Sequence, residues 1–78
     1  MEKDKWITVT ELMEALRNDP GNEHQCCRAC GILRSTHWMR YDAEKDMFIN
    51  TTYWPECDWY TEAEILQLYD NWLWMIES

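Results

Sequence analysis

The chain has 78 residues and a formal net charge of −8, and six of its eleven aromatic residues are tryptophan. A chain of this length buries only roughly 60% of the surface that its unfolded form exposes, so we expect a single domain, residues 1–78, without a deeply enclosed active site. A hydrophobic content of 46% excludes intrinsic disorder. Because phosphate backbones and anionic lipids repel a negative protein, the composition argues against direct binding of nucleic acid or of a membrane.

The negative charge is confined to the second half of the chain. Residues 1–41 contain six acidic and six basic residues, whereas residues 42–78 contain nine acidic residues and one basic residue, Lys45. Such an asymmetry predicts an acidic face on one side of the folded protein. The N-terminal residues lack the apolar stretch of a secretory signal, which predicts a cytoplasmic protein whose four cysteines are reduced.

The first predicted element is a helix over residues 9–18. Thr8 and Glu11 have the spacing of a capping box, in which each side chain satisfies a backbone N–H of the other residue. Apolar residues then recur at the helical spacing, at Val9, Leu12, Met13 and Leu16. Residues 22–35 have two interpretations: a second short helix, with Cys26, Cys30 and Leu33 on one face, or an irregular loop shaped by the cysteines.

Two further elements complete the predicted fold. Residues 37–41 and 47–52 are rich in aromatic and β-branched residues and flank a polar connection at 42–46, which predicts a β-hairpin. A second capping box, Thr61 with Glu64, predicts a helix over residues 62–76. Its buried stripe contains Ile65, Tyr69, Trp72 and Ile76, and its solvent side contains Trp74. The expected fold class is α+β: a small single domain with two or three helices packed on a short antiparallel hairpin.

The cysteines offer a candidate metal site. Cys27-Arg28-Ala29-Cys30-Gly31 has the C-x-x-C-G form of a zinc knuckle, a turn that directs two thiolates at one ion. The candidate ligands are Cys27, Cys30, Cys57, His37 and His24, with Cys26 also available. A second C-x-x-C or a closely spaced histidine pair is missing, which favours the alternative that Cys26, Cys30 and Cys57 are small buried residues, and no cofactor is expected.

Catalysis is not expected from this sequence. It has only two glycines, so a glycine-rich phosphate loop is absent, and no nucleophile turn accompanies His24 or His37. In residues 54–60, acidic residues alternate instead with tryptophan and tyrosine, residue types that often anchor protein interfaces. The predicted partner-binding residues are Asp42, Glu44, Asp46, Glu56, Asp58, Trp59, Glu62 and Trp74. The predicted partner is the basic surface of a protein that binds nucleic acid.

In size, charge and aromatic content, the whole chain resembles the small acidic proteins with which phages and mobile elements disable host defence, such as anti-CRISPR and antirestriction proteins. The resemblance rests on composition and transfers no residue role. It implies a non-enzymatic inhibitor, a monomer or homodimer in the host cytoplasm, that occupies a basic nucleic-acid channel. The alternative function is a zinc-stabilised adaptor or transcription-linked module that uses Cys27 and Cys30.

Overall fold

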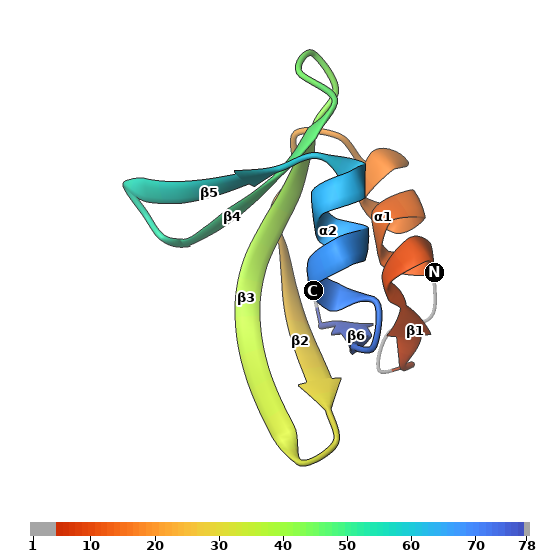
Figure 1. Ribbon diagram of the computed structural model, residues 1–78. Coiled ribbons are helices and arrows are strands. Elements are labelled where there is room, and N and C mark those ends of the chain that lie inside the picture. Colours follow the sequence, from red (N-terminus) through yellow and green to blue (C-terminus); the bar gives the residue numbers. More distant parts are fainter. Residues whose placement is uncertain (1–4, 78) are drawn as a thin grey trace.

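The computed structural model describes residues 5–77, which form a six-stranded antiparallel sheet and two short helices (Figure 1). In chain order the elements are β1 (Ile7–Thr8), α1 (Val9–Arg17), β2 (His24–Cys30), β3 (Leu33–Asp42), β4 (Met47–Tyr53), β5 (Glu56–Tyr60), α2 (Glu62–Tyr69) and β6 (Leu73–Ile76). The strand order across the sheet is β1-β6-β2-β3-β4-β5. The predicted fold of helices packed on a short hairpin is therefore wrong, because the sheet dominates and the helices cover only part of it.

Helix α1 confirms the first predicted element to within one residue. The side chain of Thr8 accepts a hydrogen bond from the backbone N–H of Glu11, and the carboxylate of Glu11 accepts one from the backbone N–H of Thr8 at 3.0 Å. The predicted apolar stripe is the buried face of the helix. The capping box and the apolar stripe each involve residues within a few helical turns of one another, which is why the sequence alone was sufficient to predict this helix.

The segment that the sequence left open is half of a hairpin. Strand β2 pairs with β3 over seven register positions, from His24 opposite Met39 to Cys30 opposite Leu33. The turn between them contains Gly31 with a φ of 62°, a value that the first position of a type II′ hairpin turn requires. Both interpretations of residues 22–35, the short helix and the irregular loop, are therefore wrong. The predicted hairpin of residues 37–52 is confirmed as β3 and β4, with a longer first strand.

The predicted helix over residues 62–76 is correct only in its first half. The capping box of Thr61 and Glu64 is present, but α2 ends at Tyr69 and the chain turns into strand β6. Strand β6 lies between β1 and β2 and pairs with both. An apolar run from Trp72 to Ile76 suits a strand with neighbours on both sides as well as it suits a helix, and periodicity alone does not separate the two.

The core lies between the two helices and one face of the sheet. From the helices it contains Val9, Leu12, Met13, Ala15, Leu16 and Ile65, and from the strands Cys26, Met39, Phe48, Trp74 and Ile76. Arg17 extends over this core, with its guanidinium carbon 5.2 Å from the centroid of the Phe48 ring. Within residues 5–77, neither helix has the length and apolar composition that crossing a membrane requires.

Beyond the helices, three hairpin ends project from the molecule (Figure 1). The β4–β5 hairpin, here called the arm, extends sideways, and the turn between β3 and β4, here called the tip, points upward in the same view. The β2–β3 turn forms the opposite, lower end. Because β4 belongs to both the arm and the tip, these two ends are held in one piece of sheet.

Candidate functional site

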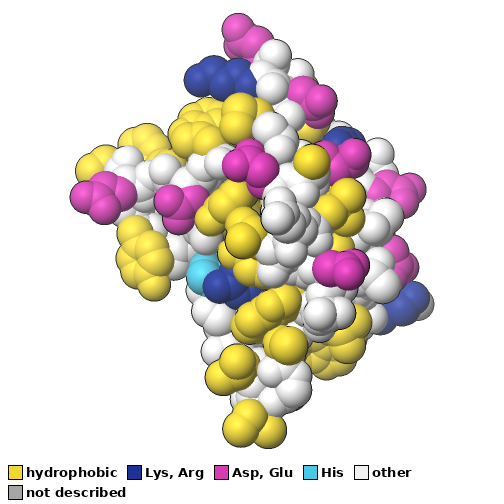
Figure 2. Space-filling model, in the orientation of Figure 1, with side chains coloured by type: hydrophobic (Ala, Val, Ile, Leu, Met, Phe, Trp, Pro, Cys, Tyr) yellow, Lys and Arg dark blue, Asp and Glu magenta, His cyan; other side chains and the backbone are white. Residues whose placement is uncertain are grey.

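The arm and the tip contain most of the predicted partner-binding residues. Asp42, Glu44 and Asp46 lie at the tip, and Glu56, Asp58 and Trp59 lie on β5. Figure 2 shows acidic side chains over the tip and the arm, interspersed with hydrophobic ones. Together with Tyr53 and Trp54, these eight exposed or half-buried residues are here called the arm surface: Asp42, Glu44, Asp46, Tyr53, Trp54, Glu56, Asp58 and Trp59.

Local hydrogen bonds fix the shape of the tip. Asp46 has a φ of 51°, and its carboxylate accepts a hydrogen bond from the hydroxyl of Tyr41 at 2.6 Å. The carboxylate of Asp42 accepts one from the backbone N–H of Lys45 at 3.1 Å. The ammonium of Lys45 lies 4.4 Å from the ring centroid of Trp59, a cation–π contact between the tip and β5. The one base in this half of the chain is thus placed over an aromatic ring.

The remaining carboxylates of the arm surface are free to meet a partner. Within residues 5–77, Glu44, Glu56 and Asp58 accept no side-chain hydrogen bond and form no ion pair. Glu62, which the sequence included in the same set, differs from them. It begins α2 and its carboxylate lies 2.7 Å from Nη1 of Arg17, so its charge is already compensated. We therefore place Glu62 outside the arm surface.

The prediction from sequence placed one tryptophan on the wrong side of the fold and did not include an exposed aromatic pair among the binding residues. Trp74 is only 1% exposed and belongs to the core, so its predicted place on a solvent face is wrong. Tyr53 and Trp54, at the end of the arm, are 73% and 71% exposed. The signal that could have found them is Pro55, since a proline that ends a strand predicts a turn, and side chains in turns are usually exposed.

The predicted metal ligands are dispersed. Cys27 and Cys30 are part of strand β2, not of a knuckle turn, and residues three apart on a strand point to opposite faces of the sheet. Ring nitrogen Nε2 of His24 lies 2.8 Å from a carboxylate oxygen of Asp19. The thiol of Cys57 donates to the carbonyl of Pro55 on the arm. In the part of the chain that the structure describes, no three His, Cys, Asp or Glu side chains are grouped to hold a metal ion.

His37 belongs to a polar network that no sequence pattern indicated. It is 7% exposed, and the network, here called the His37 network, consists of His37, Ser35, Asn50 and Thr52. The hydroxyl of Thr52 donates to Oδ1 of Asn50 at 2.5 Å, and the backbone N–H of Thr52 donates to the same oxygen at 3.0 Å. These two donors fix the amide of Asn50, whose NH₂ group then faces Nδ1 of His37 at 3.2 Å.

The orientation of the Asn50 amide determines where the proton of His37 lies. Because the NH₂ group of Asn50 donates to Nδ1, the neutral ring carries its hydrogen on Nε2 and donates it to the hydroxyl oxygen of Ser35 at 2.8 Å. Burial, and secondarily the charge of Arg28, lower the pKa of His37 and favour this neutral form. In this tautomer the His37 ring donates to Ser35 and does not accept the serine proton.

No protein-family model, curated protein or solved structure matches the chain.

Proposed function

We propose that this protein is a non-enzymatic binding protein that docks through its arm surface onto a basic surface of a nucleic-acid-handling protein in the host cytoplasm, and inhibits it by occupying that surface. The observation that carries the proposal is the pair of exposed aromatic side chains, Tyr53 and Trp54, at the end of an arm whose carboxylates form no ion pair with any of residues 5–77. Exposed tryptophan and tyrosine side chains are the commonest energetic anchors of protein interfaces.

The charge of the arm surface defines the chemistry of its partner. Glu44, Glu56 and Asp58 project from two adjacent hairpin ends, and the formal net charge of the whole chain is −8. Such a field accelerates association with a positive surface and repels nucleic acid itself. Because the positive surfaces of nucleic-acid-binding proteins are the surfaces that contact phosphates, an acidic protein docked there excludes the nucleic acid.

A capture experiment with matched charge variants tests the proposal. The arm variant contains E44K, E56K and D58K, and the control variant contains E14K, D70K and E77K, three exposed acids on α1, after α2 and after β6. Each reversal adds two positive units to the net charge of −8, so both variants have a formal charge of −2. The three immobilised proteins are incubated with lysate, and retained proteins are identified by mass spectrometry.

We expect the wild type and the control variant to retain basic nucleic-acid-binding proteins, released by high salt and by heparin, and the arm variant to lose them. Salt release follows because exposed charges are screened within about 8 Å at physiological ionic strength. Equal retention by the arm variant and the control variant would show that net charge, and not the arm surface, determines binding. Retention that resists both salt and heparin would contradict an electrostatic docking mode.

A further inference from the structure

A cationic group outside the arm surface has no counter-ion among residues 5–77. The guanidinium carbon of Arg28, on β2, lies 4.5 Å from the ring centroid of Tyr69 and 5.0 Å from that of Trp72, both at or beyond the end of α2. Among residues 5–77, no carboxylate lies within ion-pair distance of Arg28, and its Nε is buried without an acceptor. In a chain with 15 acidic and 7 basic residues, an unpaired and ring-stacked guanidinium requires an explanation.

The other stacked or bridged arginines are satisfied differently. Nη1 of Arg34 donates to the carbonyls of Gly31 at 2.7 Å and Leu33 at 3.0 Å, while its guanidinium lies over the ring of Trp6. Arg17 is paired with Glu62. The guanidinium of Arg28 contacts the rings of Tyr69 and Trp72 but has no carboxylate or carbonyl acceptor among residues 5–77. The rings therefore hold the guanidinium in place and leave its N–H donors for an external group.

The His37 network supplies a second donor beside Arg28. Ser35 is the register partner of Arg28 across β2 and β3, and the two side chains therefore lie next to each other on one face of the sheet. Since the oxygen of Ser35 accepts the Nε2–H of His37, its own hydroxyl hydrogen is directed elsewhere. A serine O–H donor whose oxygen is held by His37, and a guanidinium held between aromatic rings, are both suited to an anionic oxygen.

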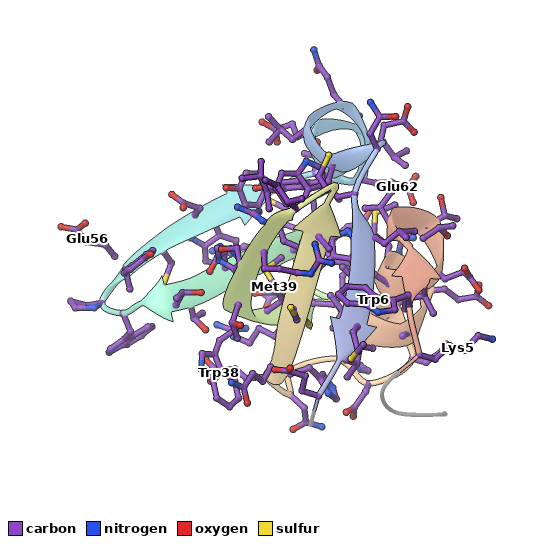
Figure 3. The ribbon with its side chains drawn as sticks, turned by 90° about the horizontal axis from the view of Figure 1, so that it is seen from below. Lys5, Trp6, Trp38, Met39, Glu56 and Glu62 are labelled. Carbon is purple, nitrogen blue, oxygen red and sulfur yellow. The ribbon has the colours of Figure 1, made fainter. Side chains whose placement is uncertain are left out.

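The surface shape is consistent with access to these groups. Figure 2 shows a hollow between the arm and the lower β2–β3 end, in which histidine atoms and Arg or Lys atoms are visible side by side. In the register of β2 and β3, His37 lies opposite Cys26, two residues along β2 from Arg28, so His37 and Arg28 are on the same face of the sheet. Figure 3 shows the arm extending away from β2 and β6 in a second view.

We infer that Arg28 and Ser35 form a binding site for a compact oxyanion, a carboxylate or a phosphoryl group, oriented by the His37 network. The guanidinium provides charge and paired N–H donors, and Ser35 provides a single O–H donor. This site is independent of the arm surface, since it shares no residue with it, and its failure would leave the proposed docking function unchanged.

Nuclear magnetic resonance of the full chain tests the site directly. Inorganic phosphate and acetate are titrated separately into ¹⁵N-labelled protein at constant ionic strength, with sodium chloride as the balancing salt, and the arginine Nε–Hε signals are followed. We expect one Nε–Hε signal, absent in R28Q, to shift and saturate. Saturation by phosphate alone identifies a phosphoryl site, and saturation by acetate at equal or lower concentration identifies a carboxylate site.

Matched variants separate the site from general charge effects. S35A should weaken binding about tenfold, the effect of losing one hydrogen bond to a charged group, and R34Q should bind as the wild type does. Backbone amide spectra establish that each variant is folded; if R28Q does not fold, the affinity of S35A decides. Absence of a saturable shift, binding retained in R28Q, unchanged affinity in S35A, or a neutral His37 with its hydrogen on Nδ1 would each overturn the inference.

Discussion

The replacement of Trp74 by alanine tests the most consequential departure of the structure from a simple helical pattern. Trp74 is 1% exposed, lies between Ile7 of β1 and Arg28 of β2, and contacts the ring of Tyr69 edge-on at a centroid distance of 5.4 Å. Truncation of a buried tryptophan to alanine costs about 3–5 kcal/mol. A domain of this length has a total stability of only about 4–12 kcal/mol, so W74A should remove about a quarter of that stability or more.

A matched surface substitution provides the comparison. Trp54 is 71% exposed, so W54A should change the free energy of unfolding by no more than about 0.5 kcal/mol. W74F should cost much less than W74A, because phenylalanine keeps most of the ring and removes an indole N–H that is buried without an acceptor among residues 5–77. The assay is urea denaturation of all three variants, monitored by far-ultraviolet circular dichroism.

The refuting result is specific. If W74A and W54A had the same unfolding free energy to within about 1 kcal/mol, Trp74 would not be a core residue. Residues 70–76 would then be better described as the continuation of α2, with Trp74 on its solvent side.

Three further predictions concern single groups. Burial raises the pKa of the Cys26 thiol to about 12. Iodoacetamide should therefore modify the three half-buried cysteines in the native protein and Cys26 only in urea. Rapid modification of all four cysteines in the native protein would contradict this prediction. The pKa of His37 is lowered in the folded state, so as the pH decreases the histidine is protonated in the unfolded chain before it is protonated in the folded one. The free energy of unfolding should therefore fall as the pH decreases through 6.5. A flat pH profile between about 5.5 and 7.5, or the same profile in H37Q, would contradict this prediction. T61A removes the cap of α2 and should cost about 1 kcal/mol in urea denaturation, with no change expected if the cap were absent.

The sequence predicted those parts of the fold that depend on neighbouring residues. Both capping boxes, at Thr8 and Thr61, are satisfied by residues three positions away and were found correctly. The start of α2 could be predicted, but its end at Tyr69 could not. What ends it is the pairing of β6 with β1 and β2, which come from the opposite part of the chain. The apolar run from Trp72 to Ile76 suits a helix as well as a strand, so residues 62–76 alone do not specify that pairing.

The candidate sites also contain some residues that could be predicted from the sequence and others that could not. The acidic members of the arm surface could be predicted because carboxylates are almost always exposed, whatever the fold. The placement of the tryptophans could not, since the exposure of Trp54 and the burial of Trp74 depend on which turn and which strand receive them. Arg28, Ser35 and His37 come together only when β2 and β3 pair and α2 ends above them, so no spacing in the sequence indicated the oxyanion site.

The central claim is that the arm surface occupies a partner's nucleic-acid surface, and competition for that surface tests it most directly. A basic protein captured by the wild type is bound to a fluorescent duplex DNA, and the anisotropy of the DNA is followed as the wild type, the arm variant or the control variant is added. We predict that the wild type and the control variant release the DNA at near-stoichiometric concentration and that the arm variant leaves it bound. A ternary complex in which the wild type and the DNA are held together would contradict the account.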